Sequence, residues 1–240
     1  MHKENNIPKT INYCWFGGKP LPEEVKKCIE SWKKYCPDYE IVEWNEKNYD
    51  IYKNFYTETA YKNKQWAFLT DYVRLDVIYS KGGVYLDTDV ELLKPLDPLL
   101  NNTCYVGMEQ PGLVNTGLGF GAIQNHPFVL ANKKYYENKQ NFLDKNGKFK
   151  KIICVKITTG LLKERGLEGK NQIQKVEDVV VYPVDYFCPK KMGTNKVTIT
   201  ENTVSIHHYD ASWKSNSRVV RKIGYYMIPV KQFIKRIVKK

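Results

Sequence analysis

Residues 67–91 read AFLTDYVRLDVIYSKGGVYLDTDVE and carry the strongest structural pattern of the chain. The first half of this stretch predicts a helix over Gln65–Ser80, because apolar residues recur there at helical spacing. Lys81-Gly82-Gly83 ends that helix, since glycine is favoured just past a helix end. Val84–Leu86 is a short apolar run, typical of a buried strand. The stretch therefore predicts a helix that returns directly into an inner strand of an α/β sheet.

Two aspartates, Asp87 and Asp89, follow this strand as a D-x-D motif. The end of a strand is where an α/β sheet usually opens a ligand crevice. Two ionised carboxylates in one short loop favour a hard divalent cation, which takes oxygen ligands from carboxylates and phosphates. A diphosphate leaving group needs such a cation, because the cation neutralises the charge that builds as the bond breaks. The motif thus predicts a metal site that serves a diphosphate.

The preceding helix adds an acid and a guanidinium. Asp71 and Arg74 are three residues apart, so they share one helix face. In isolation this spacing is typical of a surface ion pair of little energetic value. Directly before the strand and the D-x-D, it favours a pair that faces the same crevice as Asp87 and Asp89.

The rest of the chain alternates strands and helices up to about residue 140 and then becomes irregular. This alternation predicts a mixed, mostly parallel central sheet flanked by helices. The expected strands are Thr10–Phe16, Tyr39–Trp44, Tyr105–Met108, Gly117–Ile123 and Thr203–Tyr209, with strand-like runs at Lys148–Lys156 and Val176–Val184; the other expected helices are Glu23–Tyr35 and Pro127–Asn138.

The net charge of +12 comes mainly from the C-terminus. Nine of the 38 basic residues and none of the 26 acidic ones lie in residues 214–240, so the remainder is nearly neutral. This distribution disfavours a nucleic-acid-binding protein, in which the charge would spread over a reading face. Val230, Phe233, Ile234, Ile237 and Val238 follow a helical stripe among lysines, which predicts a basic amphipathic helix on an anionic membrane, with a helix packed on the body as the alternative.

Cysteine use and hydropathy favour a cytoplasmic protein. The six cysteines are scattered without a C-x-x-C pair, so we expect reduced, buried thiols. The residues after Met1 are polar and predict no signal peptide, and no apolar run is long enough to span a bilayer. With the basic tail, this predicts a location in the cytoplasm, at the inner face of the membrane.

Three segments together resemble a known family. IPKTINYCWFGG at the N-terminus, the block from Ala67 to Glu91, and IHHYDASW near the C-terminus resemble the D-x-D sugar transferases of glycosyltransferase family 32, which are related to the glucosylating bacterial toxins. The resemblance implies a GT-A fold over residues 1–213, a Mn²⁺ ion (with Mg²⁺ as the alternative), and retention of anomeric configuration. Residues 214–240 form the separate tail.

The resemblance also implies roles for single residues. Asp71, Arg74, Asp87 and Asp89 form the catalytic set; Asp87 and Asp89 bind the metal together with His208. The residues implied to bind the donor are Trp15, Asp71, Arg74, Asp87, Asn115, Ser212 and Trp213. His207 and His208 point to opposite faces of a strand, so only one of them reaches the metal, and we choose His208. A turn asparagine is the alternative for Asn115.

These features predict a retaining hexosyltransferase that moves a hexose from a nucleotide-sugar, a UDP-sugar by expectation, to a glycan or lipid-linked acceptor in capsular or surface polysaccharide synthesis. The alternative is a non-catalytic protein of the same fold that binds nucleotide-sugar or carbohydrate. A dehalogenase-type phosphatase also places D-x-D after a strand, but Glu91 stands where that class has Thr or Val.

Overall fold

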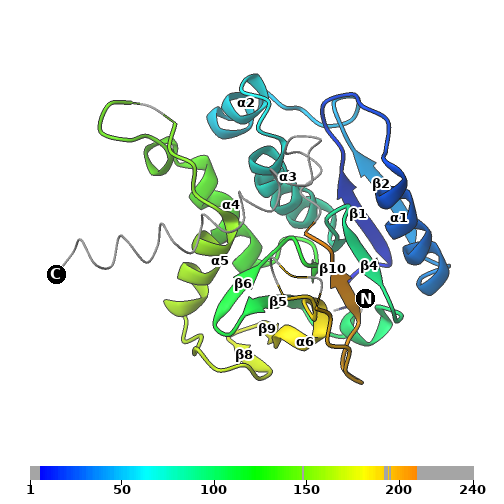
Figure 1. The fold of residues 1–240 in the computed structure, drawn as a ribbon. Coiled ribbons are helices and arrows are strands. Elements are labelled where there is room, and N and C mark those ends of the chain that lie inside the picture. The colour runs from blue at the N-terminus through cyan, green and yellow to red at the C-terminus, as the bar shows by residue number, and fades with distance from the viewer. Residues whose placement is uncertain (1–5, 148, 192–193, 195, 210–240) are drawn as a thin grey trace, which may run out of the picture.

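The computed structural model describes residues 6–147, 149–191, 194 and 196–209. Its centre is an eight-stranded mixed sheet, seen in Figure 1. Along the sheet the strands follow the order β2 (Glu40–Trp44), β1 (Thr10–Cys14), β3 (Gly83–Tyr85), β7 (Phe120–Ala122), β5 (Cys104–Gln110), β9 (Val179–Tyr182) and β8 (Gln174–Val176), and β6 (Leu113–Asn115) pairs with β5.

The sheet is mostly parallel, as predicted. β1 pairs in parallel with β2 and β3, and β5 pairs in parallel with β9. β7 runs antiparallel between β3 and β5, so β1, β2, β3, β5 and β9 share one direction, and β6, β7 and β8 oppose it. The predicted α/β class, with helices flanking a mixed central sheet, is confirmed.

Helices cover both faces of the sheet. Figure 1 shows α1 (Glu23–Tyr35) on one side of β1 and α3 (Trp66–Lys81) on the other. Beside α3 pack α2 (Phe55–Lys62) and α4 (Pro127–Glu137), and α5 (Cys154–Lys163) packs against α4 and β6. The buried apolar residues accordingly form two clusters, one beneath α1 and one beneath α3. None of the described helices is both long enough and apolar enough to cross a membrane.

The core beneath α1 depends on Trp32. Its side chain is fully buried, its ring meets Tyr13 edge-on at 5.6 Å, and its indole N–H donates to the Val90 carbonyl at 2.7 Å. We expect Trp32→Ala to lower the free energy of unfolding by about 3–5 kcal/mol, because it opens a cavity and leaves the carbonyl unpaired. Denaturant titration measures this; Lys33→Ala on the exposed face is the control, and an equal midpoint for both variants would contradict the prediction.

The predicted elements of the first 140 residues are confirmed to within a few residues, whereas later ones differ. α1 matches its predicted bounds, and α3 is shifted by one residue. The strand-like run Lys148–Lys156 is wrong: α5 begins at Cys154, inside it. Its β-branched residues pack on β6 and α4 as a helix face, which outweighs their strand preference.

A second, two-stranded sheet joins distant parts of the chain. β4 (Val90–Leu92) follows the D-x-D, and β10 (Ser205–His207) pairs with it antiparallel, with His207 opposite Val90. The six cysteines are buried and unbridged, as expected. The predicted amphipathic helix of the tail lies outside the described residues, as do Ser212 and Trp213.

Candidate functional site

The register of the parallel strands places the candidate site at their carboxyl ends. Asn12 of β1 pairs with Tyr85 of β3, so Cys14 and Asp87 lie at the same level where the two strands end. Asp87 is held there by its backbone N–H, which donates to the Gly117 carbonyl at 3.2 Å. The D-x-D thus sits where the sequence predicted a ligand crevice, at the edge of the sheet.

Arg74 links the helix to this loop. Its guanidinium is buried and contacts Asp87 Oδ1 at 3.1 Å and Asp71 Oδ1 at 3.3 Å. It also lies over the Tyr85 ring, whose hydroxyl donates to Asp87 at 3.0 Å. Asp71 and Arg74 therefore form no surface ion pair but a buried network with the first motif aspartate, as the crevice interpretation predicted.

The electrostatics of Asp71 follow from its burial. Burial raises its pKa to about 7, although the charge of Arg74 acts to lower it. One guanidinium serves two carboxylates here, so the protein leaves negative charge in the site that a cation or a hydrogen-bonding ligand can offset.

The two motif aspartates meet a histidine from the C-terminal strand. Because β10 pairs with β4, His207 Nε2 lies 3.1 Å from Asp89 Oδ1 and 3.9 Å from Asp87 Oδ2. The three side chains offer ligand atoms that all lie within 4.8 Å of one another. Burial opposes protonation of His207, but the nearby carboxylates of Asp89 and Asp87 raise its pKa overall.

This donor set fits a divalent cation. Two carboxylates and one imidazole suit Mn²⁺, Mg²⁺ or a similar ion, which would neutralise the acidic pair that Arg74 neutralises only in part. Open coordination positions on such an ion would serve the oxygens of a ligand phosphate.

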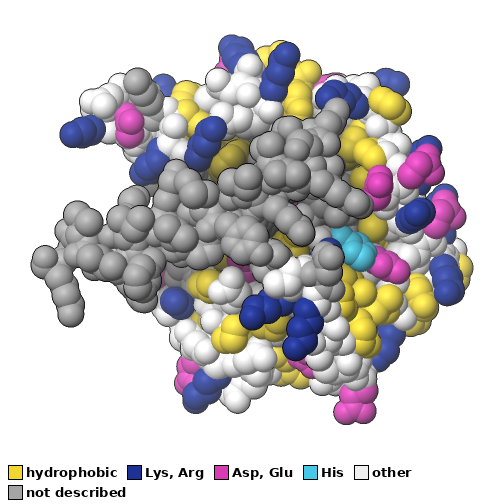
Figure 2. Space-filling view, viewed as in Figure 1, with side chains coloured by type: hydrophobic (Ala, Val, Ile, Leu, Met, Phe, Trp, Pro, Cys, Tyr) yellow, Lys and Arg dark blue, Asp and Glu magenta, His cyan; other side chains and the backbone are white. Residues whose placement is uncertain are grey.

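The structure places the other predicted ligand, His208, elsewhere. Its Nε2 lies 2.8 Å from Glu91 Oε2, and its side chain is half-buried. The two histidines do point to opposite faces, as predicted, but the face that meets the aspartates belongs to His207. The choice of His208 therefore differs from the geometry, because the antiparallel register with β4 sets which face looks inward. Figure 2 shows histidine surface beside an acidic side chain on this face of the molecule.

Asn115 lies in the same network, on β6. Its Oδ1 accepts from the Gly117 N–H at 2.7 Å, and its Nδ2 donates to Glu109 Oε2 at 3.0 Å. The Cys154 Sγ atom lies 3.6 Å from Asn115 Oδ1, to which it donates, and accepts a hydrogen bond from an Arg74 guanidinium nitrogen at 3.8 Å. Sequence reasoning missed Glu109 and Cys154; the position of Glu109 near the end of a strand was the one signal available for it.

Gly117 is a close contact of the site. A Cβ at this position would lie 2.1 Å from Asp87 Oδ2, so no other residue fits without moving that carboxylate. We expect Gly117→Ala to weaken Mn²⁺ affinity about tenfold to a hundredfold, the range typical of lost support for a metal ligand. Titration with Mn²⁺ measures this. Gly160→Ala is the matched control, since nothing lies within 4 Å of its Cβ, and an unchanged Mn²⁺ affinity in Gly117→Ala would contradict the prediction.

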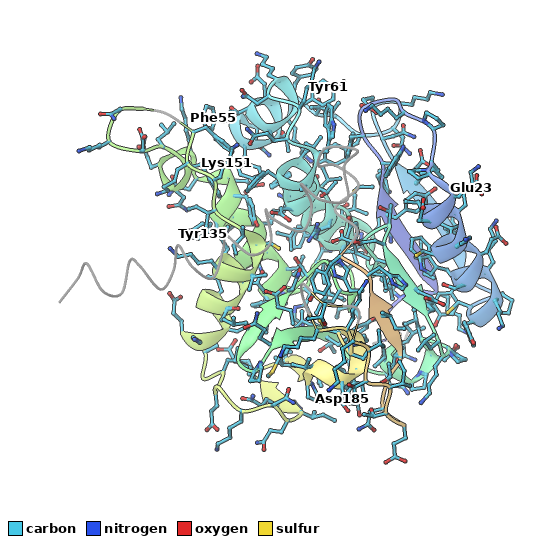
Figure 3. The ribbon with its side chains drawn as sticks, in the orientation of Figure 1. Glu23, Phe55, Tyr61, Tyr135, Lys151 and Asp185 are labelled. Carbon is cyan, nitrogen blue, oxygen red and sulfur yellow. The ribbon has the colours of Figure 1, made fainter. Side chains whose placement is uncertain are left out.

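Trp15 lies next to this network, in an open hollow of about 620 Å³. Its indole N–H donates to the Lys19 carbonyl at 2.6 Å, which fixes the ring. Two more rings line the hollow. They belong to Trp66, at the start of α3, and to Tyr61 of α2, which is labelled in Figure 3. Trp15 directly follows Cys14, which lies level with Asp87, so the hollow begins at the same carboxyl end of the parallel strands as the D-x-D.

The fold and the site define a class: an α/β protein whose D-x-D, at the carboxyl edge of a mixed sheet, meets a late histidine and a buried arginine. Comparison with known families gives this class its name. Residues 22–106 match the family described as "Glycosyltransferase sugar-binding region containing DXD motif". This match covers about a third of the chain and agrees with the resemblance seen in the sequence.

Curated relatives include two fungal enzymes. Inositol phosphoceramide mannosyltransferase 3 of Schizosaccharomyces pombe is 33% identical over 137 residues, which cover 52% of this chain and 35% of that protein. Mannosyl phosphorylinositol ceramide synthase SUR1 of Saccharomyces cerevisiae is 28% identical over 142 residues, 56% of this chain and 37% of that protein. The matches thus span little more than a third of the length of these relatives.

Solved structures with a similar arrangement also include glycosyltransferases. The PaToxG glycosyltransferase has a TM-score of 0.49 and 19% identity, covering 66% of this chain and 69% of that one. A glycosyltransferase involved in glycosylation of the major capsid of PBCV-1 has a TM-score of 0.47 and 14% identity, covering 91% of this chain and all of that one.

Proposed function

We propose that this protein is a retaining, metal-dependent hexosyltransferase that uses a nucleotide-sugar donor. The observation that carries the proposal is the cluster of Asp87, Asp89 and His207 within 4.8 Å, next to the buried Arg74–Asp71 pair. The names of the relatives support a hexose, and mannose stands beside glucose and galactose among the candidates.

Each part of the site has a role in this proposal. A divalent cation held by Asp87, Asp89 and His207 would neutralise the donor diphosphate as it departs. Arg74 holds Asp87 in place, and Asp71 accepts hydrogen bonds from sugar hydroxyls. We assign no covalent nucleophile: positioning of the acceptor and stabilisation of the leaving group account for the reaction.

The hollow beside Trp15 is the proposed place of the nucleobase. Three rings line it, and Lys19, Lys47 and Lys64 stand around it. Flat bases stack on aromatic rings whatever their hydrogen-bonding edge, so this lining leaves UDP- and GDP-sugars both open. The hollow starts from Trp15, one residue after the level of Asp87 in the strand register, so we place the base and the diphosphate of one donor at the same end of the sheet.

We expect Trp15→Ala to weaken the affinity for a nucleoside diphosphate about tenfold to a hundredfold, because base–aromatic stacking contributes roughly 1–3 kcal/mol. Calorimetric titration with UDP and GDP in the presence of Mn²⁺ measures this. Tyr35→Ala, a ring on α1 that does not line the hollow, serves as control. Equal affinities in Trp15→Ala and the native protein would place the base elsewhere.

The acceptor in this proposal is a glycan or a lipid-linked glycan of surface polysaccharide synthesis. The proposed metal is Mn²⁺, and the proposed location is the cytoplasmic face of a membrane. The relatives that modify inositol phosphoceramide support a lipid-linked acceptor. The predicted membrane contact of residues 214–240 remains a separate prediction.

A donor screen tests the proposed function. The purified protein is mixed with UDP-glucose, UDP-galactose, their N-acetyl forms and GDP-mannose, with Mn²⁺ or with a chelator, and thermal unfolding and donor hydrolysis are followed. We expect one donor to raise the Tm and to be hydrolysed only with metal. Metal-dependent stabilisation without any turnover would favour the non-catalytic binding protein, and no response to any donor would end the transferase proposal.

A further inference from the structure

Glu109 is a carboxylate of the site that the sequence did not single out. It lies near the end of β5, where the neighbouring strand β6 carries Asn115. The Glu109 side chain is half-buried, and its Oε2 accepts a hydrogen bond from Asn115 Nδ2 at 3.0 Å. Burial raises the pKa of Glu109, against the effect of that hydrogen bond.

The hydrogen bonds of Asn115 use its carbonyl oxygen and one of its two N–H hydrogens. Its Oδ1 is used by the Gly117 N–H and approached by the Cys154 thiol, so the carbonyl faces protein groups. Its Nδ2 carries two hydrogens, of which one is given to Glu109. Among the bonds of the described residues, one Asn115 N–H and one Glu109 oxygen are therefore left over. A donor beside an acceptor is the pair that a hydroxyl group uses, since it both accepts and donates.

Glu109 forms no ion pair within 4.0 Å among the described residues, although the charge of His207 acts on it from a greater distance. Asp71 and Asp87 both pair with Arg74, and Asp89 pairs with His207. A partly desolvated carboxylate without such a partner is costly unless a ligand or water satisfies it. This cost points to a ligand group that donates a hydrogen bond.

The pair lies across the network from Asp71. Asn115 is joined through Gly117 to Asp87, and through Cys154 to Arg74. The hydroxyl-binding groups on α3 and those on the β5–β6 hairpin thus flank the first motif aspartate from two sides. A hexose whose phosphate is held at the D-x-D would present hydroxyls to both sides.

We infer that Glu109 accepts a hydrogen bond from a hydroxyl of the transferred hexose, while Asn115 donates one to the same hydroxyl. This inference rests on the proposed function and adds a sugar-reading residue to it. Glu109 then distinguishes hexoses by the presence of that hydroxyl, whereas the metal and the base hollow hold the rest of the donor.

The test pairs a protein variant with altered donors. Calorimetry with Mn²⁺ measures ligand affinities of the native protein and of Glu109→Ala. The ligands are UDP, GDP, the donor found in the screen, and derivatives of that donor that each lack one ring hydroxyl. In the native protein we expect one such derivative to bind about tenfold to a hundredfold more weakly, the worth of a hydrogen bond to a charged group. Glu109→Ala should bind the parent donor more weakly and discriminate against that derivative clearly less than the native protein does, because only the Asn115 hydrogen bond to the hydroxyl is left, and it should bind UDP or GDP as the native protein does.

Other outcomes overturn the inference in distinct ways. Native-like donor affinity and hydrolysis in Glu109→Ala would sink the inference alone, and so would a loss confined to transfer onto an added acceptor. Equal weakening for the donor and for UDP or GDP would assign Glu109 a structural role, which Glu109→Gln checks by keeping the contact with Asn115. Absence of any metal-dependent donor binding by the native protein would end the inference and the proposed function together.

Discussion

Asp89→Ala is expected to abolish metal-dependent donor binding and to lower donor hydrolysis at least about a hundredfold. Loss of groups that only orient a ligand costs tenfold to a hundredfold in metal affinity or activity, and Asp89 is itself a proposed ligand. Its carboxylate lies 3.1 Å from His207 Nε2, so its removal takes away one of three donors and leaves the site with Asp87 and His207. Mn²⁺ titration and donor hydrolysis measure the two effects.

The control for Asp89 is an acid outside the site. Asp38 is an exposed side chain paired with Lys9 at 2.5 Å, and Asp38→Ala should change neither Mn²⁺ affinity nor hydrolysis. Thermal unfolding of both variants shows whether each is folded. If a folded Asp89→Ala kept its metal-dependent hydrolysis, the metal site would have to lie elsewhere, and the central observation of the proposed function would lose its meaning.

His207→Ala is expected to lower Mn²⁺ affinity and hydrolysis at least about tenfold, whereas His208→Ala should leave both near native values. The two residues are adjacent in sequence, so the comparison is closely matched: one faces the aspartates, and the other pairs with Glu91. The same two measurements decide between them. A larger loss in His208→Ala would restore the assignment made from the sequence.

The metal affinity should also depend on pH through His207. The carboxylates beside it raise its pKa despite burial, and a protonated imidazole cannot bind a metal. Mn²⁺ must therefore displace a proton from His207 once the pH falls below that raised pKa, so affinity should decrease steadily as the solution becomes more acidic. Affinity that is flat with pH in the native protein, or an equally steep slope in His207→Ala, would contradict this origin; burial also raises the pKa of Asp87, so a shallower slope should persist in the variant.

Local pattern was enough for much of the site. The helix α3 and the strand after it follow from apolar spacing and from glycines, and both lie within a residue or two of their predicted bounds. The spacing of Asp71 and Arg74 predicted a shared face, and their contact at 3.3 Å bears this out. Helical and strand geometry fix such relations within a few residues, so no distant contact is needed to predict them.

Elements whose state depends on packing were harder to predict. The strands β4 and β6 are too short to carry a period. The buried residues of α5 recur at helical spacing, but several of them are β-branched, and packing against β6 and α4 selects the helix. Glu109 and Cys154 joined the site for the same reason: the β5–β6 hairpin and the start of α5 bring them beside Asn115, and no motif marks them.

Sequence patterns were enough to predict α1, α3 and the strands β1, β2, β3, β5 and β7, the position of the D-x-D after a strand, and the face shared by Asp71 and Arg74. Three features follow from long-range contacts alone: His207 rather than His208 meets the aspartates, Arg74 is buried between two acids, and Glu109 bonds to Asn115. The physical reason is register. A shift of one residue in the β10–β4 pairing exchanges the two histidines between faces, and that register is set by contacts between segments more than a hundred residues apart.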